Sequence, residues 1–221
     1  ALRRCCGRSK CLRLLSTSPP PSAVSYVAGV EDIKAASGRI RGVAHVTPVM
    51  TCSTINAMYN KRRGGKEGAR LFFKCENFQR TGSFKFRGAL NAVSNLVEKR
   101  PANELSVVTQ SSGNHGQALA ACAQVRNVPA TIVMPHTSPS VKKAAVRGYG
   151  AMIVECEPTD QARDEASEKV VKERGGVLIH PNQDPDVIAG QGTIAMELLE
   201  QVEKLDAIVA PVGGGGMIGG H

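Results

Sequence analysis

From about residue 69 onward, short apolar runs alternate with longer stretches in which apolar residues recur at helical spacing. Short apolar runs bounded by turn residues predict buried strands, and the longer mixed stretches predict amphipathic helices. The predicted strands are 71–73, 107–108, 131–134, 152–154, 177–179 and 207–212. The predicted helices are 84–96, 118–125, 141–146, 161–172 and 194–202. Strands that alternate with helices indicate an α/β fold in which βαβ units build parallel sheets.

The overall composition adds little to this interpretation. The chain has 221 residues, of which 42% are hydrophobic and 21% are charged, and these values are typical of a soluble globular protein of one or two domains. No apolar run approaches the roughly 20 residues that a membrane-spanning helix needs, so we expect no membrane segment.

The net charge of +9 is concentrated at the start of the chain. Five basic residues and no acidic residue precede Glu31, and subtracting these five from +9 leaves +4 for the rest. The aromatic content is only 4%, and no basic helix face stands out. Because nucleic-acid binding requires a clustered basic surface, we expect no nucleic-acid partner.

Residues 1–25 are rich in Arg and Ser, lack acidic residues and run into Ser18-Pro19-Pro20-Pro21-Ser22. This pattern resembles a mitochondrial transit peptide followed by a flexible joint. The alternative is an extension with no targeting role, in which case a cytoplasmic location is expected. The seven cysteines form no CxxC pair, and although Cys5, Cys6 and Cys11 could suggest a metal clip, no histidine lies near them, so we predict a reducing compartment and no metal ligands.

Lys85 stands between Phe84 and Phe86 at the start of a predicted helix, with Ser83 as the predicted N-cap. Burial and the positive end of the helix dipole both lower the pKa of a lysine, and the neutral amine attacks aldehyde carbons. Position alone favours a surface lysine on an amphipathic helix. The flanking phenylalanines and the two motifs described next reverse that preference.

The first of these motifs, Ser111-Ser112-Gly113-Asn114-His115-Gly116, lies between a predicted strand and a predicted helix, where ligands bind in open α/β sheets. Gly113 permits a tight turn, and free N–H groups with hydroxyls can hold a carboxylate. Asn114 can bond a phenolic oxygen on a cofactor ring. The alternative is a capped turn without a ligand, and His115 by itself is more often structural.

The second motif is a run of four glycines, 213–216, directly after a predicted strand. Each glycine costs about 0.5–1 kcal/mol of backbone freedom relative to alanine, so the run needs a compensating use. Close approach of bare N–H groups to a phosphate is one such use, and a flexible tail is the alternative. A lysine amine together with a phosphate-binding loop is what pyridoxal phosphate (PLP) requires.

With these residues, the sequence resembles the fold-type II PLP enzymes, and among them the serine racemases and serine/threonine dehydratases. The similarity runs from about residue 30 to residue 219. The motifs that carry it, in order, are 74–76, 81–89, 111–117, 180–183, 190–193 and 213–216. The resemblance implies the tryptophan synthase beta-like architecture, with two parallel-sheet α/β domains of which the larger is incomplete. It places the larger domain at 29–105 and 184–221, the smaller at 106–183, and a basic extension at 1–28.

The resemblance also implies a role for each matching residue. Lys85 would be the Schiff-base lysine and the base on one face of the substrate Cα, and Ser112 the acid and base on the opposite face. The implied cofactor-binding residues are Phe84, Lys85, Asn114, Asn182, Gly213, Gly214, Gly215 and Gly216. The implied substrate-binding residues are Ser111, Ser112, Asn114, His115 and Arg163. Tyr149 and Arg163 match positions that accompany domain closure in the racemases.

The activity implied by the resemblance is interconversion of L-serine and D-serine, with elimination to a 2-oxo acid and ammonia as a second activity. Ser112 is the discriminating position, because plain dehydratases of the family commonly carry alanine there. Pro181-Asn182-Gln183 lacks the serine cluster typical of aspartate-selective members, which favours serine as substrate. The alternatives are a serine/threonine ammonia-lyase only, and a non-catalytic fragment that binds a partner.

Because the family continues for over a hundred residues past the position of His221, we expect the chain to be cut short. The resemblance allows Mg²⁺ and ATP in a full-length protein, although Arg80 replaces the lysine usual near the nucleotide site. The implied partners are a small amino-acid substrate and a second copy in a homodimer.

Overall fold

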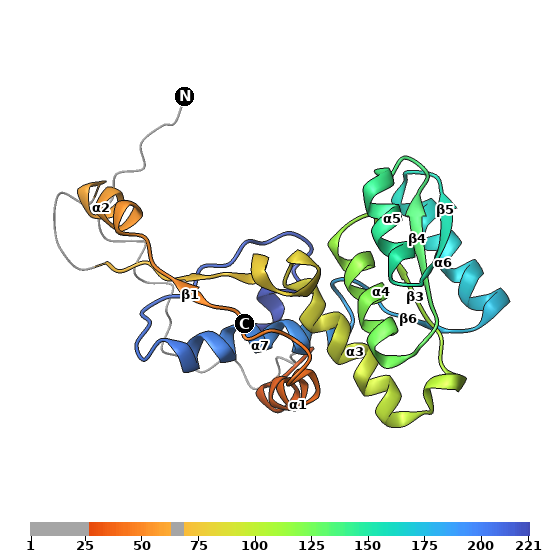
Figure 1. The fold of residues 1–221 in the computed structure, drawn as a ribbon, viewed down its shortest axis with the longest axis horizontal. Coiled ribbons are helices and arrows are strands. Elements are labelled where there is room, and N and C mark those ends of the chain that lie inside the picture. Colours follow the sequence, from red (N-terminus) through yellow and green to blue (C-terminus); the bar gives the residue numbers. More distant parts are fainter. Residues whose placement is uncertain (1–26, 63–68) are drawn as a thin grey trace.

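The computed structural model describes residues 27–62 and 69–221 (Figure 1). The helices are α1 (Val30–Ile40), α2 (Ser53–Arg62), α3 (Lys85–Lys99), α4 (Asn114–Arg126), α5 (Ser140–Gly148), α6 (Asp160–Arg174) and α7 (Pro185–Gln201). The strands are β1 (Val49–Met50), β2 (Phe73–Lys74), β3 (Val107–Gln110), β4 (Ala130–Pro135), β5 (Met152–Cys156) and β6 (Val177–Leu178). The short 3₁₀ turns are η1 (Glu76–Phe78), η2 (Arg80–Gly82), η3 (Ala102–Glu104) and η4 (Ile218–Gly220).

One parallel sheet with strand order β5-β4-β3-β6 forms the centre of the lobe on the right of Figure 1. Its two inner strands are buried along almost their whole length, because helices cover both faces. Ile132 packs with α4 residues such as Leu119, whereas Val108 and Val133 pack with Val170 of α6. All pairs in this sheet are parallel, so the carboxyl ends of its strands lie along one edge.

Helix α3 connects this lobe to the rest of the molecule, since it packs against α4 on one side and against α7 on another (Figure 1). Glycines let α3 and α7 approach closely. A Cβ added at Gly190 would lie 2.6 Å from the Cα of Gly88, which no real side chain tolerates. Helix α1 packs in turn on α7, and their contact is centred on Ala36 and Ala189.

The structure and the solved relatives confirm the predicted α/β class, and every helix predicted from the pattern is present. The predicted strand over 207–212 is wrong. Among the described residues no strand pairs with this segment, and the side chain of Val209 is 94% exposed, so an apolar run here lacks the partner that a strand needs. The predicted strand at 71–73 forms at Phe73–Lys74 instead, paired antiparallel with β1.

Helices α1 and α2 were not predicted. Helix α2 has no buried residue, so its sequence has no core-facing periodicity to detect. Helix α1 places Ile33, Ala36 and Ile40 at helical spacing, which is a signal that the sequence does carry.

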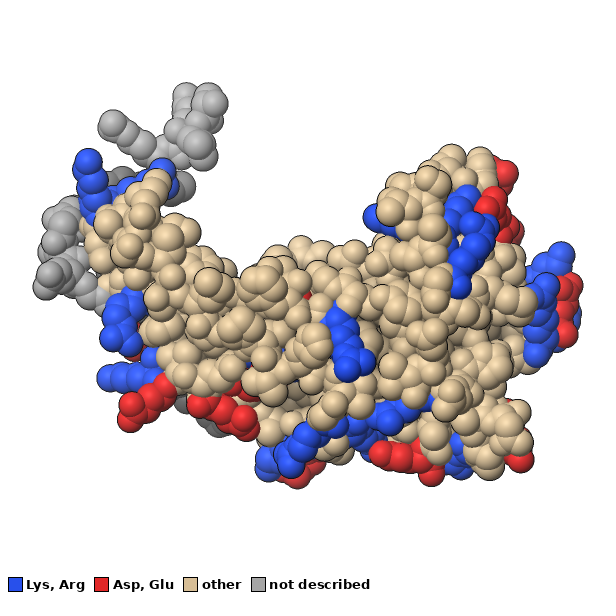
Figure 2. Space-filling view, viewed as in Figure 1, with Lys and Arg blue, Asp and Glu red and all other residues tan. Residues whose placement is uncertain are grey.

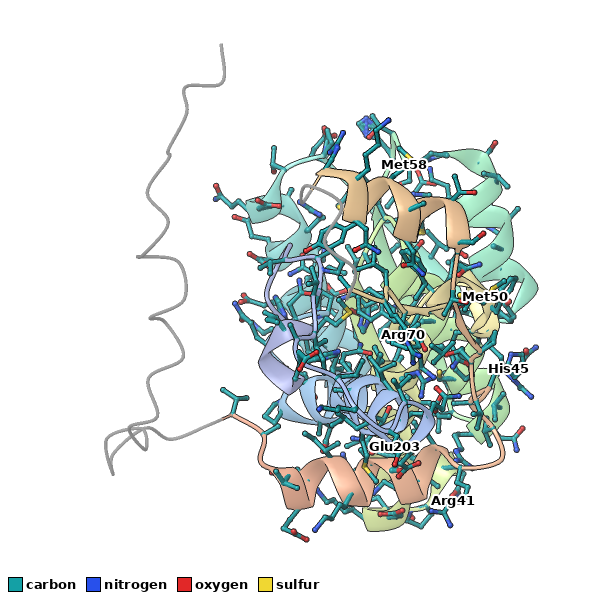
Figure 3. The ribbon with its side chains drawn as sticks, turned by 90° about the vertical axis from the view of Figure 1, so that its left-hand side faces the viewer. Arg41, His45, Met50, Met58, Arg70 and Glu203 are labelled. Atoms are coloured by element: carbon teal, nitrogen blue, oxygen red, sulfur yellow. The ribbon has the colours of Figure 1, made fainter. Side chains whose placement is uncertain are left out.

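Met50 and Met58 are exposed at the end of the molecule that faces the viewer in Figure 3.

Charged side chains are scattered rather than gathered on the face shown in Figure 2. Lys and Arg lie mainly along its edges, intermixed with Asp and Glu, and a broad uncharged expanse lies between them. Within the described ranges, no helix is both long enough and apolar enough to cross a membrane.

Candidate active site

A cleft of about 610 Å³ lies where the first turn of α3, the β3–α4 connection, the turn after β6 and the glycine run meet. All twelve of the predicted site residues line this one cleft. They are Phe84, Lys85, Ser111, Ser112, Asn114, His115, Arg163, Asn182, Gly213, Gly214, Gly215 and Gly216. Segments that are more than a hundred residues apart in the sequence therefore converge on one hollow, and the role of each residue stays a prediction.

Lys85 is the first residue of α3, and its amine points to the turn that follows β6. The Nζ atom donates hydrogen bonds to the carbonyl oxygen of Pro181 and to Oδ1 of Asn182, each at 2.7 Å. It also lies 5.4 Å from the centroid of the Phe84 ring. Burial lowers the pKa of Lys85, because no carboxylate is bonded to the amine to offset the loss of water.

The cap of this helix differs from the prediction. Phe84, rather than Ser83, occupies the N-cap position, and no side chain caps the helix. The Ser83 hydroxyl is buried without a hydrogen-bond partner among the described residues. The first turn is therefore held by tertiary contacts and not by a local serine cap.

The second motif forms the start of α4 at the carboxyl edge of the sheet. Strand β3 ends at Gln110, and the Ser111 hydroxyl accepts a hydrogen bond from the Gly113 N–H at 3.2 Å. Helix α4 begins at Asn114, so its free N–H groups open toward the cleft. Burial, with the nearby charge of Lys85, lowers the pKa of His115 to about 3, so this ring is neutral at physiological pH.

The glycine run forms a loop that packs directly on Asn182. A Cβ at Gly214 would lie 2.3 Å from Nδ2 of Asn182, and one at Gly216 would lie 2.8 Å from its Cα. Gly215 has a φ of +83°, a conformation that favours glycine. Gly213 has no atom near the position of its missing Cβ, so its bare backbone borders open space in the cleft.

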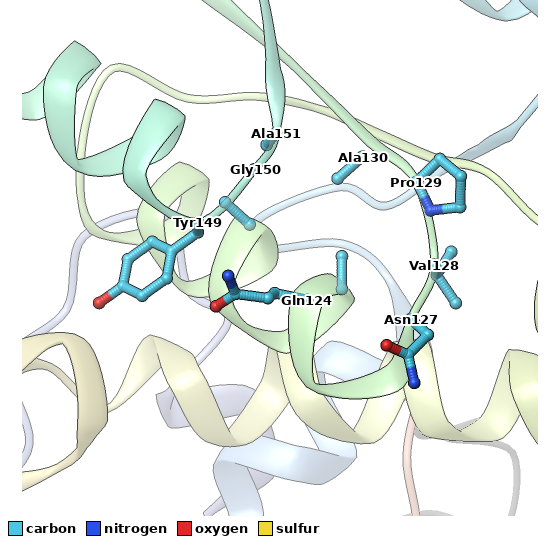
Figure 4. A pocket seen from close by; sticks show the side chains of 10 residues that line it. Gln124, Asn127, Val128, Pro129, Ala130, Tyr149, Gly150 and Ala151 are labelled. Carbon is cyan, nitrogen blue, oxygen red and sulfur yellow. The ribbon is translucent and has the colours of Figure 1, made fainter.

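Arg163 and Tyr149 lie in two different hollows of the molecule. Arg163 pairs with Asp160 and lines the cleft. Tyr149 lies instead beside Gln124 in a second hollow of about 320 Å³ (Figure 4). The structure therefore does not place Tyr149 in the cleft.

Sequence reasoning missed several residues that border the cleft. Gln110 and Lys142 line it, and Gln110 bonds to Asp164 of α6. Pro181 contributes the carbonyl that holds Lys85. Gln110 could have been found from its place at the end of a buried parallel strand, whereas nothing in the local sequence distinguishes Lys142.

A buried ion network on another side of α3 was also missed. The side chain of Arg87 is 1% exposed and bonds to Glu76 at 2.8 Å and to Glu197 at 2.9 Å. Lys74 also bonds to Glu197. Burial by itself would lower the pKa of Arg87, but the hydrogen bonds to the two carboxylates raise it above its ordinary value.

The residues of the cleft fit PLP. The cofactor needs an amine that can lose its proton and a phosphate site, and the cleft offers a half-buried lysine with a lowered pKa together with backbone amides free of side chains. The close packing of Gly214 on Asn182 also leaves no room for a side chain in this part of the loop. Within the described residues, no group of three His, Cys, Asp or Glu side chains could hold a metal ion.

The comparisons with known proteins agree with the predicted family. Residues 40–221 match the family described as "Pyridoxal-phosphate dependent enzyme". Human serine racemase is 51% identical over 199 residues, covering 88% of this chain and 55% of that protein. The beta-hydroxyaspartate dehydratase of Paracoccus denitrificans is 50% identical over 195 residues, covering 88% and 59%. The solved maize serine racemase has a TM-score of 0.80 at 43% identity, covering 88% and 56%.

The fold thus defines an α/β protein whose cleft brings the predicted site residues together. The chain belongs to the pyridoxal-phosphate dependent enzyme family, and its relatives include serine racemases and ammonia-lyases. It spans a little over half the length of the curated relatives described above.

Proposed function

We propose that the protein interconverts L-serine and D-serine with PLP as cofactor, and that it eliminates the β-hydroxyl of serine or threonine as a second activity. One observation carries the proposal. The desolvated amine of Lys85 and the hydroxyl of Ser112 come from different elements and border the same cleft as the glycine loop. Racemisation needs two proton-transferring groups, and the cleft supplies an amine and an alcohol.

PLP, when bound, withdraws electrons from the Cα of an attached amino acid and so makes its proton acidic. Lys85 would take that proton at Nζ, and its lowered pKa favours the neutral amine that this role needs. Ser112 would return a proton from its hydroxyl on the opposite face, which inverts the centre. Loss of the β-hydroxyl before reprotonation gives the elimination product.

The remaining residues would bind and orient. The amides of 213–216 would hold the phosphate, and Phe84, Asn114 and Asn182 would hold the ring. The substrate carboxylate would meet the start of α4 at Ser111, Asn114 and His115. Because His115 is neutral, it would act as a hydrogen-bonding group and not as a positive charge. Arg163 borders the same cleft and would contribute to substrate binding.

The second candidate is an ammonia-lyase without racemase activity. Its support is that similar proteins are named beta-hydroxyaspartate dehydratase in Paracoccus denitrificans and L-threo-3-hydroxyaspartate ammonia-lyase in yeast. The presence of Ser112 favours the racemase, because elimination needs only one base.

Chiral chromatography after incubation with PLP and L-serine tests the proposal. We expect D-serine together with pyruvate and ammonia. Ser112→Ala should remove D-serine formation while pyruvate formation continues, because Lys85 alone suffices for elimination. Lys85→Ala should remove both products.

Glu98→Gln is a suitable control, because Glu98 is exposed, pairs with Arg39 and does not line the cleft. Pyruvate without D-serine from the unaltered protein would reject the racemase and favour the ammonia-lyase. Neither product, with no PLP bound, would favour the non-catalytic alternative.

The family resemblance supports four further proposals. They are a homodimer, Mg²⁺ and ATP binding, the division of the chain at 105/106 and 183/184, and a cytoplasmic or mitochondrial location. Residues 1–25, which bear on the location, are outside the described residues. Arg80, which stands where the resemblance places the nucleotide site, has its guanidinium 5.9 Å from the centroid of the Phe86 ring.

A further inference from the structure

His180 is a half-buried histidine that has no role in the chemistry proposed above. It lies two residues after the end of β6 and precedes the turn at 181–183. Its Nδ1 atom accepts hydrogen bonds from two backbone amides, those of Asn182 at 3.2 Å and Gln183 at 3.1 Å. An imidazole nitrogen accepts only when it carries no proton, so Nδ1 is bare and the proton of the neutral ring is on Nε2.

The turn that His180 holds carries the contacts of the cofactor lysine. Both hydrogen-bond acceptors of Lys85 belong to it, namely the carbonyl of Pro181 and Oδ1 of Asn182. Asn182 also packs on Gly214 and Gly216 of the glycine loop. The turn is therefore the element that touches the amine and the predicted phosphate loop at once.

We propose that His180 is a positioning residue for PLP binding, because its unprotonated Nδ1 fixes the 181–183 turn and thereby places Asn182 between Lys85 and the glycine loop. The inference rests on the proposed function, in which the cleft binds PLP. His180 acts through Asn182 and is not a catalytic residue.

The effect of His180 should be local, because the next element has its own cap. Asp184 accepts a hydrogen bond from the Val187 N–H at 3.0 Å and so starts α7 independently of the histidine. Loss of the Nδ1 acceptor therefore frees the amides of Asn182 and Gln183 without removing the cap of the following helix.

A matched pair of variants separates the acceptor from the bulk of the ring. His180→Asn keeps an acceptor, Oδ1, at the position of Nδ1, whereas His180→Leu keeps a similar volume without an acceptor. Each variant is titrated with PLP and followed by the absorbance of the lysine adduct. Removing two hydrogen bonds should weaken PLP binding by about tenfold or more in His180→Leu, and His180→Asn should stay within about threefold of the unaltered protein.

Controls distinguish this inference from the function on which it rests. His45→Leu alters an exposed histidine that does not line the cleft, and it should leave the PLP affinity unchanged. Lys85→Ala should abolish the adduct. If the unaltered protein forms no Lys85-dependent adduct, the proposed function fails, whereas equal affinities in His180→Leu and the unaltered protein overturn only the role of His180.

A spectroscopic measurement tests the acceptor in the unaltered protein without PLP, and a variant serves only to assign the resonance. In the ¹⁵N-histidine-labelled protein, a long-range ¹H–¹⁵N spectrum at neutral pH should show that Nδ1 of His180 is the unprotonated nitrogen, with the resonance assigned by its absence in His180→Asn. A proton on Nδ1 would overturn the inference, as would a tenfold weaker binding of PLP by His180→Asn.

Discussion

Two basic residues in one turn of α3 have opposite electrostatic surroundings: Lys85 faces the cleft, and Arg87 belongs to the buried ion network. Lys85 and Arg87 are two residues apart, so their side chains leave the helix about 200° apart. Lys85 reaches neutral acceptors, and burial lowers its pKa. Arg87 lies between the carboxylates of Glu76 and Glu197, which raise its pKa although the residue is more deeply buried.

The partners of a buried base, and not its burial alone, therefore set the direction in which its pKa shifts. An amine without a carboxylate is poised to lose its proton and react. A guanidinium between two carboxylates stays charged and joins three segments, namely α3, η1 and α7. The network thus anchors the turn whose other side presents Lys85.

The largest loss of stability should come from replacing Arg87, the cation at the centre of the network. Arg87→Met leaves Glu76 and Glu197 without the cation between them, and breaking a buried pair in this way costs about 3–5 kcal/mol of unfolding free energy. Urea unfolding followed by far-UV circular dichroism measures the loss. Arg39→Met, which breaks a pair with the exposed Glu98, should cost about 1 kcal/mol or less. Equal losses in the two variants would contradict the comparison.

Removing a carboxylate of the network should have an intermediate effect on the free energy of unfolding. Burial alone would raise the pKa of Glu197, but hydrogen bonds from Arg87 and Lys74 hold it below its ordinary value. A carboxylate with a lowered folded pKa adds stability above its unfolded pKa of about 4.3, and this stability is lost as the pH falls through the folded pKa. The protein should therefore lose stability in acid, and Glu197→Gln should flatten that loss.

At neutral pH, Glu197→Gln should cost about 1.5–3 kcal/mol, the typical value of a hydrogen bond to a charged group. Thermal unfolding across a pH series measures both effects. Glu200→Gln, on an exposed position of the same helix, should leave the pH profile unchanged. An acid profile that is identical in Glu197→Gln and the unaltered protein would show that the network does not depend on this carboxylate.

The same two regions also show what the sequence can predict. Lys85 was singled out because its signals are local, in the phenylalanines on both sides of the lysine, and its helix was predicted over 84–96, with only the cap misplaced. The partners of Arg87 lie 11 and 110 residues away, so no local pattern reveals them. The segment 207–212 was predicted as a strand from its apolar run, but strand formation needs a partner that the run itself does not specify.

The candidate site could be predicted as a set of motifs but not as a geometry. The sequence supplied the lysine, the Ser111–Gly116 motif and the glycines, and the structure brings them to one cleft. That Asn182 bridges Lys85 and the glycine loop follows from the turn after β6, whose position depends on the pairing of β6 with β3. Sequence spacing alone contains neither that pairing nor the hydrogen bonds of His180.

The smallest effect on stability should come from Lys85→Met, the counterpart of Arg87→Met two residues away. It removes a desolvated charge and leaves two neutral acceptors, so the unfolding free energy should change by about 1 kcal/mol or less at neutral pH. Because the folded pKa of Lys85 lies below its unfolded value, the unfolded state binds more protons between the two. The stability of the unaltered protein should therefore rise with pH across that window relative to Lys85→Met.

Borohydride reduction in the presence of PLP, followed by peptide mass spectrometry, identifies the lysine that binds the cofactor and so tests the comparison of Lys85 with Arg87. A PLP adduct at residue 85 should form in the unaltered protein and in Lys142→Met, which alters a second lysine of the cleft, and should be absent in Lys85→Met. A Lys85→Met protein that unfolds as easily as Arg87→Met would mean that the amine is a structural partner like the guanidinium. A trapped adduct on Lys142 instead of Lys85 would assign the cofactor to the other side of the cleft.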